Sequence, residues 1–459
     1  MQRKPNGLED PRPAIFVARP GRFPYNGHAE FAPKIMLGKT PNPAGIGRAK
    51  IAGLKDVDIL VGIPSYNNAR TIGHVVRAVE AGLTKYFPGH RSVLVNSDGG
   101  SSDGTTDIVR EASIDFDSVL LDHRKSGFHK LVTPYHGIPG KGSAFRTVFE
   151  IARELKVKAC AVVDSDLRSI TPEWIELLIK PVLEEGYDYV SPYYMRHKYD
   201  GTITNTIVYP LTRALYGKRI RQPIGGDFGL SGRLASFYLD KDVWESDVAR
   251  FGIDIWMTTT AIANGFKICQ AFLGAKIHDA KDPGADLSAM LHQVVGSVFD
   301  LMEEYAGTWR TVKGSEAVAT FGFVYSVGLE PIQVNLEKMI EKFQMGVKEL
   351  APFYRSFLPE DVLAFLHDLA ARPDRRAFVY TDAAWVRTVL HFALACHRKV
   401  VSREHIIKSL TPLYLGKVAS FVIETWDCTA EEVEKRIEEL CLSFEGEKGY
   451  LIERWNGKA

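Results

Sequence analysis

The feature that most constrains this chain is an alternation of apolar strands with amphipathic helices between residues 56 and 300. Ile72, Val75, Val76 and Val79, for example, fall on one face of a predicted helix. Strands are predicted at residues 58–64, 92–96, 118–121 and 159–163, and helices at 69–83, from 105, at 142–155 and from 172. This alternation predicts an α/β fold, with a mostly parallel sheet covered by helices on both faces.

The flanking segments differ from this pattern. Residues 1–50 hold eight prolines and six glycines without apolar periodicity, which predicts an extended N-terminal arm. After about residue 300 the strand signals become few, and five helices are predicted, at residues 336–350, 359–371, 383–396, 404–413 and 430–440. We therefore expect an arm (1–50), an α/β domain (51–305) and a helical C-terminal domain (306–459).

Charge and cysteine usage exclude several classes of protein. Lys and Arg number 57 against 56 Asp and Glu, so the basic excess typical of nucleic-acid binders is missing. Five scattered cysteines without a CxxC pair indicate a reducing compartment, which we take to be the cytoplasm. The N-terminus has no signal-peptide pattern, and no run of 18 apolar residues predicts a membrane span.

Two carboxylates follow the apolar strand at 159–163, in the sequence Asp164-Ser165-Asp166. Ligands of open α/β sheets bind beyond the carboxyl ends of the strands. Paired carboxylates at that edge suit Mg²⁺ or Mn²⁺ bound to a diphosphate, although a solvated turn would have the same sequence.

Other polar loops are predicted at the same edge. Residues 64–68 (PSYNN) close the first strand, residues 96–105 (NSDGGSSDGT) close the second, and Lys141 lies between two glycines. Lys141 can contact a phosphate, and the remaining loops can hold a base and a ribose. Each loop alone is most simply a turn, and their shared position is what indicates a nucleotide site.

The loops at 64–68, 98–105, 140–142 and 164–166 resemble the nucleotide-sugar-binding half of GT-A glycosyltransferases. Three further segments narrow the resemblance, namely PIGGD (223–227), FGIDI (251–255) and AKIH (275–278). Together they resemble the retaining branch that contains glucosyl-3-phosphoglycerate synthase and mannosylglycerate synthase, over roughly residues 56–300.

The resemblance implies a role for each matched residue. Asp166 and His278 would bind the metal, and Asp254 would hydrogen-bond the sugar, with Gly225 and Gly226 lying under it. The nucleotide sugar, a UDP-, GDP- or ADP-hexose, would contact Pro64, Tyr66, Asn68, Asp98, Lys141, Asp164 and Ser165. Lys276 and Lys281, which flank His278, are alternative contacts for an anion, although we interpret such lysines more simply as solvated.

The acceptor is less defined, although the resemblance implies a small hydroxy acid such as glycerate. The phosphoglycerate enzymes have an Arg for the acceptor phosphate where this chain has Thr202, which argues against a phosphorylated acceptor. Thr204, Asn205 and Arg196 are the predicted acceptor contacts, and His197, Lys198 and Arg213 are nearby candidates to replace the Arg.

The implied reaction is front-face transfer with retention, in which the leaving phosphate oxygen takes the acceptor's proton. If Asp254 were instead a general base, the reaction would be inverting, as in enzymes that load a hexose onto a polyprenyl phosphate. A non-catalytic nucleotide-sugar-binding protein is a further alternative. A sugar-1-phosphate nucleotidyltransferase would need a Gly-rich loop with Arg where Pro64 begins its loop. We expect a homo-oligomer, most simply a dimer.

Overall fold

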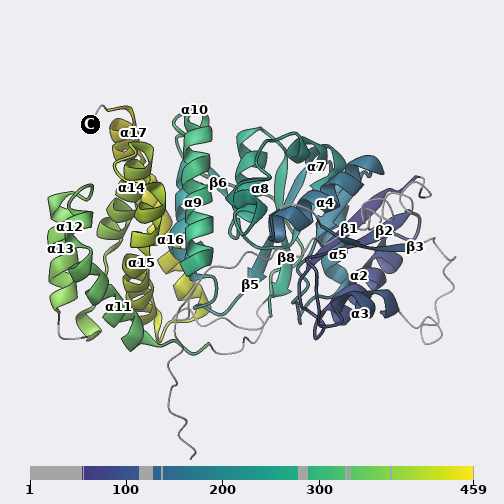
Figure 1. Ribbon diagram of the computed structural model, residues 1–459, viewed down its shortest axis with the longest axis horizontal. Helices are drawn as coiled ribbons and strands as arrows, with labels where there is room; N and C mark the ends of the chain where they lie inside the picture. Colours follow the sequence, from purple (N-terminus) through teal and green to yellow (C-terminus); the bar gives the residue numbers. More distant parts are fainter. Residues whose placement is uncertain are drawn as a thin grey trace, which may run out of the picture. The chain divides into compact units, whose positions relative to one another are not determined.

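The computed structural model describes residues 54, 56–112, 128–135, 138–277, 288–325, 329, 332–372 and 375–457 (Figure 1). The predicted arm at 1–50, the predicted strand at 118–121, and His278 and Lys281 lie outside these residues. Residues 43–459 form one compact unit, and the description below concerns that unit.

An eight-stranded sheet forms the centre of the α/β part, in the order β10-β8-β5-β7-β4-β1-β2-β3. All neighbouring strands are parallel except β7, which is antiparallel to β4 and β5. The bounds are β1 Ile59–Ser65, β2 Ser92–Asp98, β3 Phe128–Pro134, β4 Ala159–Val162, β5 Tyr189–Met195, β7 Phe228–Ser231, β8 Ile268–Ala275 and β10 Thr320–Phe321. The prediction of a mostly parallel sheet is confirmed, and β3 was not predicted.

Helices cover both faces of the sheet, because side chains of a strand alternate between its two sides. In β1, Ile59, Val61 and Ile63 face one core, while Leu60 faces the other. The first core is closed by α2 (Ile72–Tyr86) and α5 (Pro172–Glu185), and the second by α4 (Lys141–Glu154), α7 (Gly232–Leu239) and α8 (Ile253–Ala263). The short α3 (Thr105–Glu111) follows β2. The predicted apolar face of α2 is fully buried.

The C-terminal region is helical, as predicted. Its helices are α9 Ser288–Glu304, α10 Ala306–Trp309, α11 Leu336–Glu349, α12 Ala351–Tyr354, α13 Glu360–Ala371, α14 Asp382–His397, α15 Arg403–Thr425, α16 Ala430–Gly446 and α17 Lys448–Asn456. A short parallel pair, β6 (Lys218–Arg219) with β9 (Glu316–Ala317), lies outside the main sheet.

Helix α15 is longer than predicted. It continues through Pro412 to Thr425, because most of its residues are buried against neighbouring helices and tertiary packing outweighs the cost of an internal proline. By length and composition α15 is apolar enough to cross a membrane, although it holds no continuous run of 18 apolar residues. Of its apolar window, 78% is buried inside the protein.

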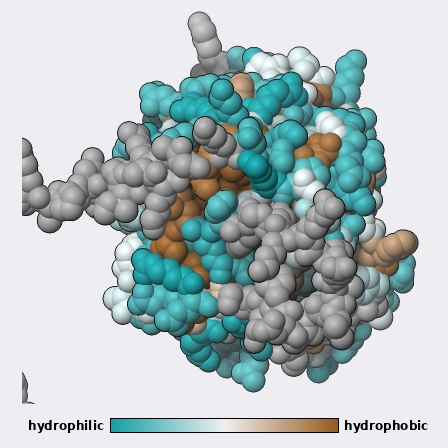
Figure 2. Space-filling model, turned by 90° about the vertical axis from the view of Figure 1, so that its right-hand side faces the viewer, coloured by the Kyte–Doolittle hydropathy of each residue, from teal (hydrophilic) through white to brown (hydrophobic). Residues whose placement is uncertain are grey.

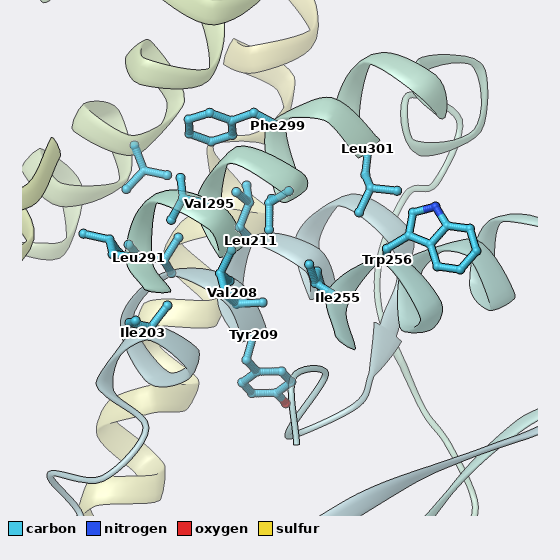
Figure 3. Packing of buried hydrophobic residues seen from close by; sticks show 14 of the residues in the cluster. Ile203, Val208, Tyr209, Leu211, Ile255, Trp256, Leu291, Val295, Phe299 and Leu301 are labelled. Atoms are coloured by element: carbon cyan, nitrogen blue, oxygen red, sulfur yellow. The ribbon is translucent and has the colours of Figure 1, made fainter. Parts of the chain in front are cut away.

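One hydrophobic core joins the two parts of the chain. Helix α9 contacts both α8 and α15. Helix α6 (Tyr209–Tyr216) follows a π-helical turn at Thr204–Val208 and contacts α16. Figure 3 shows side chains of these segments in contact, among them Val208, Leu211, Ile255 and Val295. The division of the chain at residue 305 stays a prediction.

A buried ion pair reinforces this junction. Arg213 of α6 is completely buried, and its guanidinium lies 2.7 Å from Glu445 and donates to Glu438 at 2.8 Å, both in α16. Arg213 is therefore a structural residue, and its sequence-based candidacy as an acceptor contact is wrong.

We expect Arg213→Met to lower the free energy of unfolding by about 2–3 kcal/mol in urea titrations. This is below the roughly 3–5 kcal/mol typical of a broken buried pair, because both glutamates keep some contact with water. The matched control is the exposed Arg219, whose side chain hydrogen-bonds only Ser315 among the described residues. Arg219→Met should change the free energy of unfolding by less than about 0.5 kcal/mol. Equal losses in the two variants would contradict the structural role of Arg213.

Candidate active site

A cleft of about 810 Å³ opens at the carboxyl ends of β1 and β4, where the strand order reverses direction. The coloured part of the face seen in Figure 2 is mainly hydrophilic, with apolar side chains visible where it is hollowed. Twelve of the fifteen predicted site residues line the cleft: Pro64, Tyr66, Asn68, Lys141, Asp164, Ser165, Asp166, Arg196, Thr204, Gly225, Gly226 and Asp254.

Three predicted residues do not line the described cleft. Asp98 is buried under its turn, where it accepts hydrogen bonds from the hydroxyls of Ser65 and Ser101 and from the N–H groups of Gly100 and Ser101. Its carboxylate holds the loop, and its contact with a base stays a prediction. Asn205 lines a smaller cavity next to the cleft, and His278 lies outside the described residues.

The 64–68 loop is tied to the acidic turn by side-chain hydrogen bonds. Asn68 Oδ1 accepts from Ser165 Oγ at 2.8 Å, and Thr71 Oγ1 donates to the carbonyl of Ser165 at 2.8 Å. Asn68 and Ser165 thus position the turn. Tyr66, which is 62% exposed, and Tyr135 both border Gly99, and these two rings offer flat surfaces for a base. Tyr135 was not predicted.

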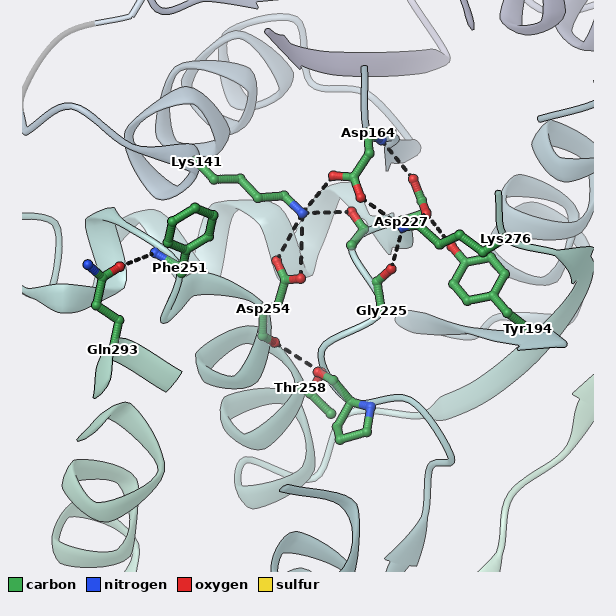
Figure 4. A network of polar contacts seen from close by, with 12 residues as sticks. Lys141, Asp164, Tyr194, Gly225, Asp227, Phe251, Asp254, Thr258, Lys276 and Gln293 are labelled. Atoms are coloured by element: carbon green, nitrogen blue, oxygen red, sulfur yellow. Dashed lines mark hydrogen bonds and ion pairs between the residues drawn. The ribbon is translucent and has the colours of Figure 1, made fainter. Parts of the chain in front are cut away.

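Lys141 connects the acidic turn with α8 (Figure 4). Its Nζ lies 2.7 Å from Asp164 Oδ1 and 3.3 Å from Asp254 Oδ1, and it donates to the carbonyl of Gly226 at 3.2 Å. Asp254 Oδ1 is buried and accepts no hydrogen bond from the described residues. Asp254 itself lines the cleft, and among the described residues its Oδ1 is paired with Lys141 alone.

Lys276 makes a second set of contacts on the other side of Asp164. Its Nζ lies 2.8 Å from Asp164 Oδ2, Asp227 Oδ2 and the carbonyl oxygen of Gly225. Asp227 also accepts from the N–H of Asp164 at 2.7 Å and from the hydroxyl of Tyr194. Only 4% of the Lys276 side chain is exposed, so the interpretation of Lys276 as a solvated lysine is wrong.

The electrostatics of this network follow from burial and pairing. Burial by itself would lower the pKa of Lys141, but the carboxylates of Asp164 and Asp254 outweigh burial and raise it. Burial favours the neutral form of Asp164, yet the two lysines hold its pKa well below the usual range. Burial raises the pKa of Asp227 and of Asp254, and the lysines only reduce this effect.

Gly226 is required by this network. Its φ is +93°, which disfavours a side chain, and a Cβ there would lie 2.2 Å from Asp164 Oδ2. At Gly225 a Cβ would lie 2.2 Å from a ring carbon of Pro192. The glycines are thus needed for contacts within the protein itself, whereas the resemblance implied only room for a sugar.

The described lining of the cleft includes a carboxylate that is available to bind a cation. Asp166 is exposed, lines the cleft and has no partner there, whereas both oxygens of Asp164 face lysines. Among the described residues no group of three His, Cys, Asp or Glu side chains converges. A divalent cation held largely by phosphate oxygens and water needs only one or two protein ligands, so the residues present fit such an ion.

Two residues near the predicted acceptor site serve the fold. Thr202 is buried and shares a hydrogen bond of 2.6 Å with Tyr414 of α15. Lys198 Nζ donates to the carbonyls of Thr425 and Trp426 at the end of the same helix. Lys198 therefore caps α15 and does not replace the missing Arg, while Arg196 remains in the cleft wall.

We expect Lys276→Met to lower the free energy of unfolding by about 3–5 kcal/mol, because it leaves two buried carboxylates without their shared cation. Adding Asp227→Asn should recover part of the loss in a double-mutant cycle measured by urea unfolding. The control is Lys85→Met, an exposed lysine that pairs with Glu173 at 3.3 Å and should cost under about 1 kcal/mol. A full loss in the double variant would contradict the charge balance described above.

Comparison with known proteins agrees with this geometry. Residues 71–299 match the family described as mannosylglycerate synthase, GT domain. The glucosyl-3-phosphoglycerate synthase of Petrotoga mobilis is 26% identical over 278 residues, which cover 56% of this chain and 77% of the relative.

Solved structures of the Mycobacterium tuberculosis glucosyl-3-phosphoglycerate synthase are also similar. The complex with Mg²⁺ and UDP is 21% identical, with a TM-score of 0.40, covering 56% of this chain and 82% of the other. The complex with Mn²⁺, UDP-glucose and phosphoglyceric acid is 21% identical, with a TM-score of 0.39, covering 58% and 86%. From the family match, the curated relative and the sheet, we conclude that the chain is a GT-A glycosyltransferase similar to the mannosylglycerate and glucosyl-3-phosphoglycerate synthases.

Proposed function

We propose that the chain is a metal-dependent, retaining glycosyltransferase that moves a hexose from a nucleotide sugar to a small hydroxy-acid acceptor such as glycerate or phosphoglycerate. The observation that carries the proposal is the convergence of the acidic turn, Lys141, Gly226 and Asp254 in one cleft, from segments up to 113 residues apart. The relative from Petrotoga mobilis, named for glucosyl-3-phosphoglycerate, supports the choice of substrates.

Each part of the cleft has a place in this reaction. Tyr66 and Tyr135 would stack against the base, and Lys141 would contact the diphosphate as a point charge. Asp254, which lines the cleft, would accept a hydrogen bond from a sugar hydroxyl and so fix the orientation of the donor. Arg196 and Thr204 would bind the acceptor on the far wall.

Asp166 is the described residue that would hold Mg²⁺ or Mn²⁺. When bound, the ion would neutralise charge that develops on the departing diphosphate. His278 is the second proposed ligand, from the resemblance. Asp164 would keep the acidic turn and the Gly225–Gly226 segment in register through its two lysines, acting as a positioning residue.

The scarcity of free carboxylates in the described cleft argues against a double displacement, and it favours front-face transfer as the route to the proposed retention. A double displacement needs a second carboxylate as nucleophile near the anomeric carbon. Asp164 is held by two lysines, which leaves Asp254 without such a partner in the described cleft. Front-face transfer, with the leaving phosphate oxygen as proton acceptor, requires no further group. A cytoplasmic location and a homo-oligomeric state remain predictions from the sequence.

The inverting alternative, transfer to a polyprenyl phosphate, would use Asp254 as general base. The specific observation in its favour is that burial raises the pKa of Asp254.

The anomer of the product separates the two reactions. From an α-linked donor we expect an α-linked product, because front-face attack keeps the configuration. Proton NMR of the anomeric signal during turnover measures this directly. A β-linked product would establish inversion and reject the retaining proposal.

A thermal-shift screen with UDP-, GDP- and ADP-hexoses and Mn²⁺ tests the function as a whole. A donor present at 100 times its Kd should stabilise the protein by about 2.7 kcal/mol. In Asp166→Asn we expect the part of the shift that depends on the cation to disappear. Asp107→Asn, an exposed carboxylate on α3, should behave as the wild type. The proposal fails if none of these donors changes the melting temperature.

A further inference from the structure

The cleft of the candidate active site has an apolar side that the proposed function does not use. Six lining residues on this side are apolar or aromatic, and we call them the apolar wall: Tyr199, Ile203, Ile224, Phe251, Met290 and Val294. They belong to the segments that follow β5 and precede β7 and α8, and to α9. The two tyrosines proposed to stack on the base follow β1 and β3, on the other half of the sheet. The apolar wall is therefore separate from the surfaces proposed for the base.

Packing within the protein accounts for only part of the apolar wall. Ile203 and Val294 are 4% and 2% exposed and belong to the core that joins the α/β part to the helices. Met290 packs against that core but is only partly buried. Phe251 is 47% exposed and belongs to neither core of the described residues. Apolar side chains that meet water inside a concave site are the ones that a ligand covers on binding.

The exposed members of the apolar wall are held next to each other. Met290 and Val294 are four residues apart on α9, so they lie on the same face of that helix. Gln293 lies beside Val294 in the sequence, and its Oε1 accepts a hydrogen bond from the N–H of Phe251 at 3.2 Å (Figure 4). The backbone of Phe251 is thus fixed against the turn of α9 that carries the other two side chains, and the wall is formed before a ligand binds.

The apolar wall borders the groups that are proposed to hold the reactants. Phe251 precedes Asp254, the proposed sugar contact, by three residues, and both line the cleft. Thr204, a proposed acceptor contact, directly follows Ile203, and Arg196 lines the cleft with them. An acceptor that places its hydroxyl near the sugar and its carboxylate near Arg196 therefore has the apolar wall beside its remaining substituent.

The chemistry of the apolar wall limits what this substituent can be. A hexose and a glycerate carry oxygen on nearly every carbon, and a hydroxyl buried without a hydrogen-bond partner costs free energy. An aryl or branched alkyl group gains free energy there instead, in proportion to the apolar area that leaves water. A cleft of about 810 Å³ lies in the upper part of the range of small-molecule sites, which leaves room for such a group.

We propose that the acceptor is a hydroxy acid with an apolar substituent, aryl or branched alkyl, and that Phe251 and Met290 select it. The proposal rests on the proposed function and defines which hydroxy acids the cleft prefers. In the transfer, the acceptor's hydroxyl oxygen forms the bond to the anomeric carbon, and the bond from that carbon to the diphosphate oxygen breaks. The hydroxyl proton passes to the leaving phosphate oxygen, so the step needs no further reactant.

A series of acceptors tests this preference. Glycolate, lactate, 2-hydroxyisovalerate, 3-phenyllactate, glycerate and 3-phosphoglycerate are compared by kcat/KM, with Mn²⁺ and the nucleotide hexose that gives the largest thermal shift. We expect kcat/KM to rise about 4-fold for each apolar carbon that is added to glycolate. 3-Phenyllactate should exceed glycerate by at least about 10-fold. A preference for glycerate or 3-phosphoglycerate over 3-phenyllactate, or for a polyprenyl phosphate over all of them, would overturn the proposal.

Met290→Gln keeps the length of the side chain and makes it polar. We expect it to lower kcat/KM for 3-phenyllactate by about 10-fold and to leave kcat/KM for glycolate, which has no substituent, within about 2-fold. Phe251→Ser should give the same pattern, and both residues are exposed enough for the fold to tolerate the change. Met345→Gln on α11, at a 61% exposed position, is the matched control and should change neither value. Equal losses with both acceptors would show that the wall is only structural and would overturn the proposal.

Titration calorimetry separates this proposal from the proposed function. 3-Phenyllactate is titrated into the protein with Mn²⁺ and the nucleoside diphosphate of the same donor, and binding should show a negative heat-capacity change. Binding that Met290→Gln weakens, together with no transfer from any nucleotide hexose, would refute the proposed function and leave the apolar subsite in place. Transfer to glycerate without any binding of 3-phenyllactate would do the reverse.

Discussion

The alternation of charge from Lys141 through Asp164 to Lys276 and Asp227 is the interaction on which the active-site region depends. It joins the start of α4, the turn after β4, the Gly225–Gly226 segment and the end of β8, none of which are adjacent in the chain. Each charge is buried at a cost that only the neighbouring opposite charge offsets. The same network leaves the carboxylate of Asp166 without a protein partner in the described cleft. The buried ion pairs thus fix their own side chains and leave Asp166 available for ligands.

The C-terminal helices are continuous with the α/β part in both packing and polar contacts. Arg213 is paired with α16, Lys198 caps α15, and Thr202 is bonded to Tyr414. All three lie in the segment of 196–213 that borders the acceptor side of the cleft. Because α16 also holds Arg221 through Glu434, the helical part supports this wall at a further point.

Much of the site was predictable because its residues lie in loops with a recognisable composition. The acidic turn at 164–166, the glycine-flanked Lys141 and the 64–68 loop each follow a predicted strand, and parallel strands bring such loops to one edge. Lys276, Asp227 and Arg221 were missed or misjudged, because nothing in their local sequence distinguishes a buried, paired charge from a solvated one. Asp98 holds its own turn, and the sequence does not tell such a carboxylate from one that faces a ligand.

The sequence by itself determined the alternating α/β order, the helical C-terminal region and the set of polar loops that meet at one edge of the sheet. Periodicity and turn residues are local signals, and they carry this information without knowledge of the neighbours in space. Only the tertiary structure decided which charged residues are paired and which buried polar atoms stay without a hydrogen bond. Those properties depend on burial and on distances between segments as far apart as residues 221 and 434, which no local pattern contains.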